Sequence, residues 1–319
     1  MEDEVSVRIP PPACFRPAQL RTASSSTKPL DLAFDLHEPP PDRKRGDGSG
    51  PIVFLHGLFG SKKNNRTMSK VLARDLGRPV YAVDLRNHGD SPHDPLHNYT
   101  ALALDVENFL RTHSLRSSTL IGHSMGAKAA MTVALRSALP SSSSYSPSPS
   151  SSSASSEDAG PSVAALVAID NAPVDAALKS DFAQYVRGMR LVEDARVTRQ
   201  KDADALLAPY APQLPVRQFL LTNLVRPRGA PPDAPLKFRI PVRTLAAALD
   251  DMSDFPFKDP SEARWVGPAL FVRGTKSHYV ADDVLPVVGE FFPRFELADV
   301  ESGHWVVSEN PEGFRSGEF

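Results

Sequence analysis

The feature that most constrains the fold is an alternation of short apolar runs with segments of helical periodicity. Each apolar run is nearly continuous and is bounded by Gly, Pro or Asp, which is typical of a strand buried on both faces of a parallel sheet. The runs cover residues 51–57, 79–85, 118–122, 163–170 and 268–274. Apolar residues at helical spacing over 65–77, 99–113 and 125–139 indicate repeated βα units. The sequence therefore predicts an α/β fold with an open, mostly parallel, doubly wound sheet.

Two segments interrupt this alternation. Residues 141–156, SSSSYSPSPSSSSASS, contain almost nothing to bury, and we interpret them as a surface insertion within the first part of the core, residues 30–170. Residues 171–262 contain helical patterns but no convincing buried strand, so we expect a helical cap over the carboxyl edge of the sheet. The second part of the core then covers residues 263–319.

The first 29 residues have a composition of their own. The start MEDEV is acidic, which argues against a targeting peptide, but the stretch from Ser6 to Leu30 carries four basic side chains and no acidic one. A targeting segment and a flexible, Pro-rich tail fit this composition equally. The single cysteine, Cys14, cannot form an internal disulfide, which fits a reducing compartment.

Composition excludes several classes of function. The chain has 319 residues, of which 41% are hydrophobic, so it can bury a substantial core. Its 36 basic and 38 acidic side chains nearly balance, which argues against binding to nucleic acid or to an anionic membrane. No apolar run approaches the roughly 20 residues of a membrane span. The sequence has no phosphate loop, dinucleotide fingerprint or zinc-spaced His/Cys set, so we expect no cofactor and no metal.

The stretch TLIGHSMGAKAAM, residues 119–131, predicts a nucleophile at Ser124. A serine between Gly122 and Gly126, after a strand and before a helix, is typical of a sharp turn that presents the hydroxyl at the helix amino end. The backbone amide of Met125 then points at any negative charge that develops beside the hydroxyl. The alternative is a turn serine that only caps the helix.

A serine hydroxyl needs a base, and His304 is the favoured one of nine histidines. It follows the last strand-like run, RFELADV, in a Gly-containing turn, where a loop at the carboxyl edge would face Ser124. The alternative role for His304 is packing beside Trp305. His123 adjoins the nucleophile but points elsewhere, and His56 is expected to fix its loop by hydrogen bonding. Five other histidines are interpreted as loop or solvent residues: His88, His93, His97, His113 and His278.

The third member of such a triad is a carboxylate that orients the imidazole and stabilises its charged form. Asp170 ends the run 163–170, which places it on the same edge as the serine and the histidine. The turn after the run 268–274, GTKSH, contains no acid before Asp282 and Asp283. Asp170 is therefore favoured, while Asp282 and the DDMSD cluster, residues 250–254, stay open as alternatives. A strand-end aspartate that merely caps its turn is the other interpretation.

A second oxyanion donor besides Met125 is expected from the segment HGLFGS after the first core strand. Gly57 allows the backbone to turn, so that the amide of Leu58 can face the same point as the amide of Met125. The alternative is a glycine-rich turn needed only to leave the strand.

These motifs, in this order and spacing, resemble the α/β-hydrolase superfamily. The resemblance extends from about residue 50 to 314 and is carried by FLHGLFGSKKN, VDLRNHGDSPH, GHSMGAKAAM, AIDNAPVD and SGHW. More narrowly, the chain resembles the branch that holds small bacterial esterases, a mitochondrial α/β-hydrolase-domain protein and fungal ethanol acetyltransferases. In that branch the acid follows the sixth strand in a motif like IDxAPVD, so the resemblance implies Asp170, with Ser124, His304, Leu58 and Met125 in the roles given above. It also implies a mitochondrial location, with the cytoplasm as the alternative.

The expected function is that of a carboxylesterase or thioesterase that acts through an acyl-enzyme on small or medium acyl esters. An alcohol acyltransferase, in which a small alcohol replaces water, uses the same triad and is the first alternative. A catalytically idle hydrolase fold that only binds a ligand is the second. Family members continue into a final helix after NPEGF, and RSGEF is short and polar, so the second part of the core is expected to be truncated.

Overall fold

The computed structural model describes residues 28–41, 49–139, 162–175 and 180–316. Cys14, the serine-rich insertion at 141–156 and all but the last two residues of the N-terminal segment lie outside the described residues. The expectations for these segments therefore stay sequence predictions.

Seven strands form the central sheet. They are β1 (Phe34–His37), β2 (Ile52–Leu55), β3 (Val80–Val83), β4 (Ser118–His123), β5 (Val163–Ile169), β8 (Ala269–Gly274) and β9 (Phe295–Val300). Their order is β1-β3-β2-β4-β5-β8-β9, with β1 antiparallel at the edge and all other neighbours parallel. The predicted fold class is confirmed. The sequence does not predict β1, because its residues are partly exposed and form no continuous apolar run.

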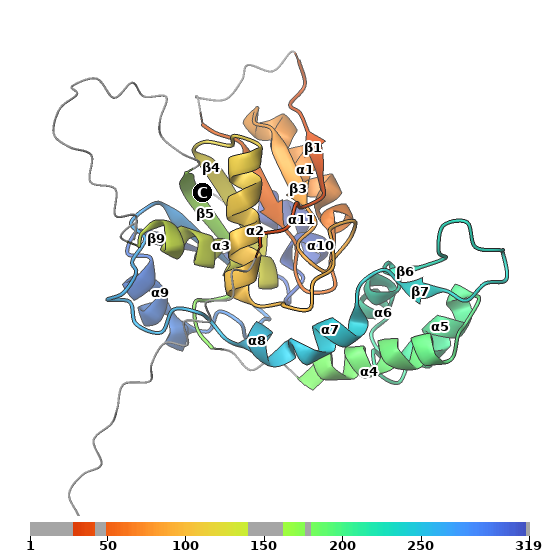
Figure 1. The fold of residues 1–319 in the computed structure, drawn as a ribbon. Helices are drawn as coiled ribbons and strands as arrows, with labels where there is room; N and C mark the ends of the chain where they lie inside the picture. The colour runs from red at the N-terminus through yellow and green to blue at the C-terminus, as the bar shows by residue number, and fades with distance from the viewer. Residues whose placement is uncertain (1–27, 42–48, 140–161, 176–179, 317–319) are drawn as a thin grey trace, which may run out of the picture.

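Helices cover both faces of this sheet (Figure 1). The helices on one face are α1 (Lys62–Leu76), α10 (Val306–Glu309) and α11 (Pro311–Ser316). Those on the other are α2 (Tyr99–Thr112), α3 (Met125–Ser137) and α9 (Leu285–Phe291), which follows a short 3₁₀ turn, η1 (Asp282–Val284). Two hydrophobic clusters, one on each face, hold the strands between these helices.

Successive residues of β2 show why the sheet is buried on both sides. Ile52 and Phe54 pack with the cluster that contains Phe314 of α11, whereas Val53 and Leu55 belong to the larger cluster on the opposite face. All four β2 side chains are at most 1% exposed, which explains the continuous apolar run in the sequence.

The cap between β5 and β8 is mainly helical, as predicted. It comprises α4 (Ser180–Asp194), α5 (Gln200–Leu207), α6 (Leu214–Leu221), α7 (Val242–Ala247) and α8 (Leu249–Ser253). A two-residue ladder of β6 (Leu224–Val225) with β7 (Lys237–Phe238) is an addition that the sequence does not predict, because two residues give no periodic signal. In Figure 1 the cap extends away from one edge of the sheet.

Lys128 of α3 joins the core to the cap. Its Nζ donates to the carbonyl oxygens of Ser253 and Asp254, each at 3.0 Å, at the end of α8. Burial lowers the pKa of Lys128 to about 8. The hydroxyl of Tyr99 donates to the carbonyl of Met252 at 3.0 Å beside it, so the helix that follows Ser124 is fixed to the cap.

Candidate active site

Ser124 lies in the turn between β4 and α3 and has φ 54° and ψ −115°, in a region that non-glycine residues rarely adopt. The flanking glycines make this turn possible. A Cβ on Gly122 would lie 2.2 Å from the carbonyl oxygen of Gly126, and a Cβ on Gly126 would lie 2.5 Å from that of Leu55. The strand, the helix and β2 therefore approach so closely only because both positions lack a side chain.

The register of the sheet brings the predicted residues to one edge. His123 pairs with Ile169 across β4 and β5, so Ser124 and Asp170, which follow them, are neighbours. His304 lies in the loop after β9, whose carboxyl end reaches the same edge. Since all three strands are parallel, their following loops meet there.

A hydrogen-bonded chain joins these three side chains. His304 Nδ1 lies 2.6 Å from Asp170 Oδ2, and its Nε2 lies 2.9 Å from the Oγ of Ser124. A carboxylate only accepts, so Nδ1 carries the proton and Nε2 of the neutral imidazole accepts from the hydroxyl. The imidazole is therefore oriented to take the proton of Ser124.

Asp170 is fully buried and has φ 51°. Besides His304, the backbone amide of Gly274 donates to its Oδ1 at 3.1 Å and the hydroxyl of Ser277 donates to its Oδ2 at 2.5 Å. These three donors offset the cost of removing a carboxylate from water.

The alternative acids lie away from the imidazole. Asp282 accepts from Arg273 at 2.5 Å, and its side chain is 87% exposed. The acidic side chains of the 250–254 cluster are exposed as well. Among the described residues, Asp170 is the carboxylate bonded to His304.

Two residues after β8 contact the hydrogen-bonded side chains of Asp170 and His304, and the sequence did not lead us to predict either contact. Ser277 donates to Asp170, and the ring of Tyr279 stacks on the imidazole of His304 with centroids 4.2 Å apart and planes at 27°. The contact of Ser277 could have been predicted, because the segment GTKSH has a serine hydroxyl in the turn where many related folds have the catalytic acid. Nothing in the sequence indicates the stacking of Tyr279.

The two predicted oxyanion amides belong to segments next to Ser124. Met125 is the first residue of α3, directly after Ser124. A Cβ on Gly57 would lie 3.3 Å from the Cβ of Ser124, so the turn that contains Leu58 approaches the serine closely. In the described part of the chain, neither amide has a recorded hydrogen-bond partner. Both can therefore donate to a negative oxygen.

The turn after β2 contains a second strained residue. The amide of Gly60 donates to the carbonyl of Gly57 at 2.9 Å, and Phe59 between them has φ 62°. A left-handed conformation costs a non-glycine residue about 1–2 kcal/mol. Other contacts must therefore hold this turn.

Buried histidines supply some of those contacts. His56 Nε2 accepts from the amide of Leu85 at 3.0 Å, which confirms the prediction that His56 fixes its loop. His88 Nε2 accepts from the amide of Phe59 at 3.1 Å. The prediction that His88 and His97 face solvent was wrong, because both side chains are at most 1% exposed. Burial lowers the pKa of His97 to about 3.

His123 supports the histidine loop from the strand. Its Nε2 donates to the backbone carbonyl of His304 at 2.8 Å. Burial, and second the neighbouring imidazole of His304, lower the pKa of His123 to about 4. His123 is therefore neutral at physiological pH.

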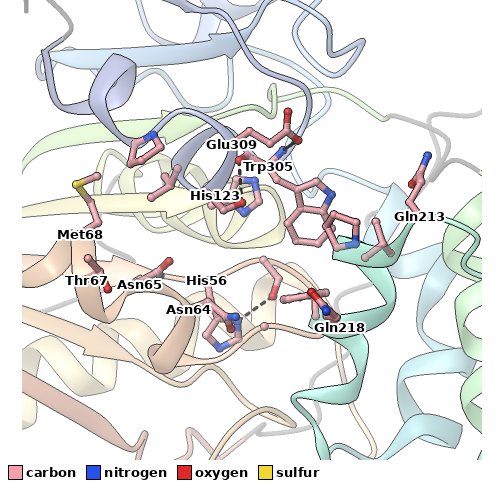
Figure 2. A pocket seen from close by; sticks show the side chains of 18 residues that line it. His56, Asn64, Asn65, Thr67, Met68, His123, Gln213, Gln218, Trp305 and Glu309 are labelled. Carbon is pink, nitrogen blue, oxygen red and sulfur yellow. Dashed lines mark hydrogen bonds between the residues drawn. The ribbon is translucent and has the colours of Figure 1, made fainter. Parts of the chain in front are cut away.

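A cavity of about 920 Å³ adjoins the triad (Figure 2). It lies between the start of α1, the cap helix α6 and the segment that begins at Trp305. His123 and Trp305 line it, with rings 5.9 Å apart, whereas their chain neighbours Ser124 and His304 do not. The cavity is thus beside the Ser124 hydroxyl rather than around it.

The lining is almost uncharged. It includes Glu309, whose carboxylate accepts from the amide of Gly303 at 2.6 Å, and no Lys or Arg among its described residues. Asn65 is 6% exposed, and its Nδ2 has no partner among the described residues. Phe219 and Trp305 form an apolar wall, with centroids 4.5 Å apart. The cavity suits an uncharged, largely apolar group.

Within the described ranges, no group of three or more His, Cys, Asp or Glu side chains is arranged to hold a metal ion. None of the helices in the same part of the chain is long and apolar enough to cross a bilayer.

Comparison with known proteins gives one family and several relatives. The family described as "alpha/beta hydrolase fold" matches residues 50–311. A Saccharomyces cerevisiae protein named "Probable alcohol acetyltransferase" is 39% identical over 298 residues, which cover 89% of this chain and 80% of that protein. The Xenopus laevis protein named "sn-1-specific diacylglycerol lipase ABHD11" is 35% identical over 301 residues, covering 91% of this chain and 83% of that one.

A solved structure agrees with these relatives. The structure titled "Marine microorganism esterase" superposes with a TM-score of 0.73 at 26% identity and covers 89% of this chain and 97% of its own. The similar proteins thus carry names of acyl transfer and of ester hydrolysis.

Proposed function

The chain belongs to the alpha/beta hydrolase fold family, and from that premise we propose that it is a serine esterase or thioesterase that works through an acyl-enzyme. One observation carries the proposal: the unbroken hydrogen-bonded chain from the carboxylate of Asp170 through His304 to the hydroxyl of Ser124. A hydroxyl, a neutral imidazole and a buried carboxylate in this order are what nucleophilic acyl transfer requires.

The reaction begins when the Oγ of Ser124 attacks the carbonyl carbon of the ester. Its proton passes to Nε2 of His304, and Asp170 stabilises the imidazolium that forms. The carbonyl oxygen becomes negative and accepts hydrogen bonds from the amides of Leu58 and Met125. When the tetrahedral intermediate collapses, the leaving alcohol or thiol takes the proton from His304, and the acyl group stays on Ser124.

The second half of the reaction repeats these steps with a new nucleophile. A water molecule loses a proton to His304 and attacks the acyl-enzyme, which releases the acid and restores Ser124. If a small alcohol attacks instead, the product is a new ester, with the same proton transfers. The 39% identity to a protein named as an alcohol acetyltransferase favours this as the second candidate function.

The cavity beside the triad supports an uncharged ester as substrate. His56 and His123 line it, and burial lowers the pKa of both, so neither carries charge near neutral pH. Phe219 and Trp305 form an apolar wall that would contact the apolar part of the substrate.

A fluorophosphonate probe tests the nucleophile, because it forms a covalent adduct only with an activated serine. We expect stoichiometric labelling of the wild-type protein on Ser124 and no labelling of Ser124→Ala. Equal labelling of both proteins would mean that another residue reacts, and no labelling of a folded wild type would favour an idle binding module; either result contradicts the proposal.

The acceptor is decided by a partition experiment on one acyl donor. Hydrolysis and ester formation are measured together, with and without added ethanol. An esterase releases acid at the same rate in both conditions, whereas an acyltransferase diverts most of the acyl group to the ethyl ester.

A further inference from the structure

The strained turn after β2 is held from two sides, by the core and by the cap. On the core side, the amide of Phe59 donates to Nε2 of His88 at 3.1 Å. The Nδ1 of His88 lies 2.8 Å from the carbonyl oxygen of Arg86, so it carries the proton and leaves Nε2 as the acceptor. Burial lowers the pKa of His88 well below its usual range, which keeps this acceptor available near neutral pH.

On the cap side, Asn223 bonds the backbone carbonyl of Phe59. Its Nδ2 donates to the carbonyl oxygen of Phe59 at 2.7 Å, and the side chain is only 2% exposed. Asn223 lies between α6 and β6, 164 positions along the chain from Phe59. Phe182 of α4 adds a ring contact with Phe59, with centroids 6.0 Å apart.

The two sides are also joined to each other. The carbonyl oxygen of Asn223 accepts from the amide of Arg239, just after β7. The guanidinium of Arg239 donates to the carbonyl of Gly89 at 3.1 Å and to the carboxylate of Asp90. Both acceptors belong to the core loop that contains His88. The cap strands and this core loop are therefore bonded to each other as well as to the turn that contains Phe59.

Leu58 precedes Phe59, so the direction of its amide depends on this turn. Phe59 has φ 62° within a turn closed by the Gly60–Gly57 hydrogen bond, and distant hydrogen bonds from His88 and Asn223 help to hold this unfavourable conformation. If the cap moved away, Phe59 would lose the Asn223 and Phe182 contacts at once. The Leu58 amide would then no longer be fixed toward the oxyanion.

We propose that Asn223 is a positioning residue for the oxyanion site, through which docking of the cap fixes the Leu58 amide and couples enclosure of the substrate to stabilisation of the transition state. This inference rests on the proposed serine mechanism. It adds that the cap acts in the chemical step as well as in enclosing the substrate.

Steady-state kinetics of ester hydrolysis on Asn223→Asp and Asn223→Ala test the proposal. Asp keeps the shape but replaces the donor with an oxygen that repels the Phe59 carbonyl, and Ala removes the donor. We expect kcat to fall by roughly 10–100-fold, because a misdirected oxyanion donor weakens only the transition state. KM should change by less than about threefold, because the substrate ground state does not use the donor.

A trifluoromethyl ketone inhibitor gives the second readout. It forms a tetrahedral adduct with Ser124 whose oxyanion needs both amides, so its affinity should fall by the same factor as kcat. Thr222→Ala is the matched control, since the Thr222 hydroxyl donates only to Phe219 within the cap. This neighbouring variant should keep wild-type kcat and inhibitor affinity.

The outcomes separate the two claims. If wild-type protein is labelled by the fluorophosphonate but kcat and inhibitor affinity are unchanged in folded Asn223→Asp, the coupling is wrong and the serine mechanism stands. A rise in KM at constant kcat would assign Asn223 to substrate binding and also overturn it. If both Asn223 variants fail to fold, Arg239→Met, which loosens the cap without touching Phe59, decides the matter: a fall in kcat supports the coupling and an unchanged kcat overturns it.

Discussion

Ser124 and Asp170, at the ends of β4 and β5, both have a positive φ, but they are held there by different means. Both residues follow paired strand positions, with φ 54° and φ 51°. At Ser124 the cause is local, because Gly122 and Gly126 leave the space that the turn needs. At Asp170 no glycine adjoins, and the carboxylate is held by donors from β8, its following loop and the loop after β9.

The difference shows how two parts of one site depend on different parts of the chain. The serine turn is defined by five consecutive residues, so it forms wherever the strand and helix form. Asp170 can bond His304 only after the sheet has brought together residues that are more than a hundred positions apart. Local substitutions should therefore damage the first through folding and the second through chemistry.

Asp170→Asn should give the largest kinetic effect. Asn tolerates a left-handed conformation as Asp does, so the fold should persist. The amide cannot stabilise the imidazolium and favours the wrong tautomer of His304, so kcat should fall by on the order of 10⁴-fold. Hydrolysis of a chromogenic ester measures it. Asp282→Asn, at the rejected acid, is the control, and an equal loss in both variants would contradict the assignment.

Gly122→Ala should break the local turn instead. Its Cβ would lie 2.2 Å from backbone atoms of Gly126, so α3 must shift, and we expect a loss of about 3 kcal/mol in the free energy of unfolding. Denaturant unfolding measures the change. Gly289→Ala is the control. Gly289 lies inside the helix α9, and a Cβ there would make an ordinary contact of 3.4 Å with the ring of Phe295. Comparable losses in the two variants would mean that the Gly122 contact carries no special weight.

Acid should weaken the β4 end through His123. Burial lowers its pKa from 6.5 to about 4, so between these values the unfolded chain binds a proton that the folded protein does not. The free energy of unfolding must then fall as the pH drops through this window, by on the order of 1 kcal/mol. His123→Gln should flatten this part of the curve, whereas a substitution of the exposed His278 should not. Parallel curves for wild type and His123→Gln would refute the assignment.

Ser277→Ala should give the smallest effect, because it removes one of three donors to Asp170. We expect kcat to fall by about tenfold, since the carboxylate keeps the amide of Gly274 and the imidazole of His304. The control is Thr275→Ala, which removes an exposed hydroxyl from the same turn. A loss as large as that of Asp170→Asn would show that the carboxylate depends on Ser277 alone.

Several elements could be predicted because consecutive residues in the sequence carry the signal for them. The five apolar runs that became β2, β3, β4, β5 and β8 lie in the sheet between two layers of helices, and most of their residues are buried or half-buried, so a nearly continuous apolar run identifies each of them. The edge strand β1 and the ladder of β6 with β7 are short and partly exposed, and composition does not mark them. The burial of His88 escaped prediction for a similar reason, because its partner Phe59 is 29 positions away.

The amino-acid sequence by itself determined the alternation of buried strands and helices in the core and the position of the serine turn, because burial and the need for glycine act on neighbouring residues. Only the tertiary structure decided which acid faces His304, which hydroxyl supports that acid, and that Asn223 of the cap reaches the turn beside Leu58. These contacts join residues 107 to 164 positions apart, and such pairs meet only after the sheet and the cap have packed.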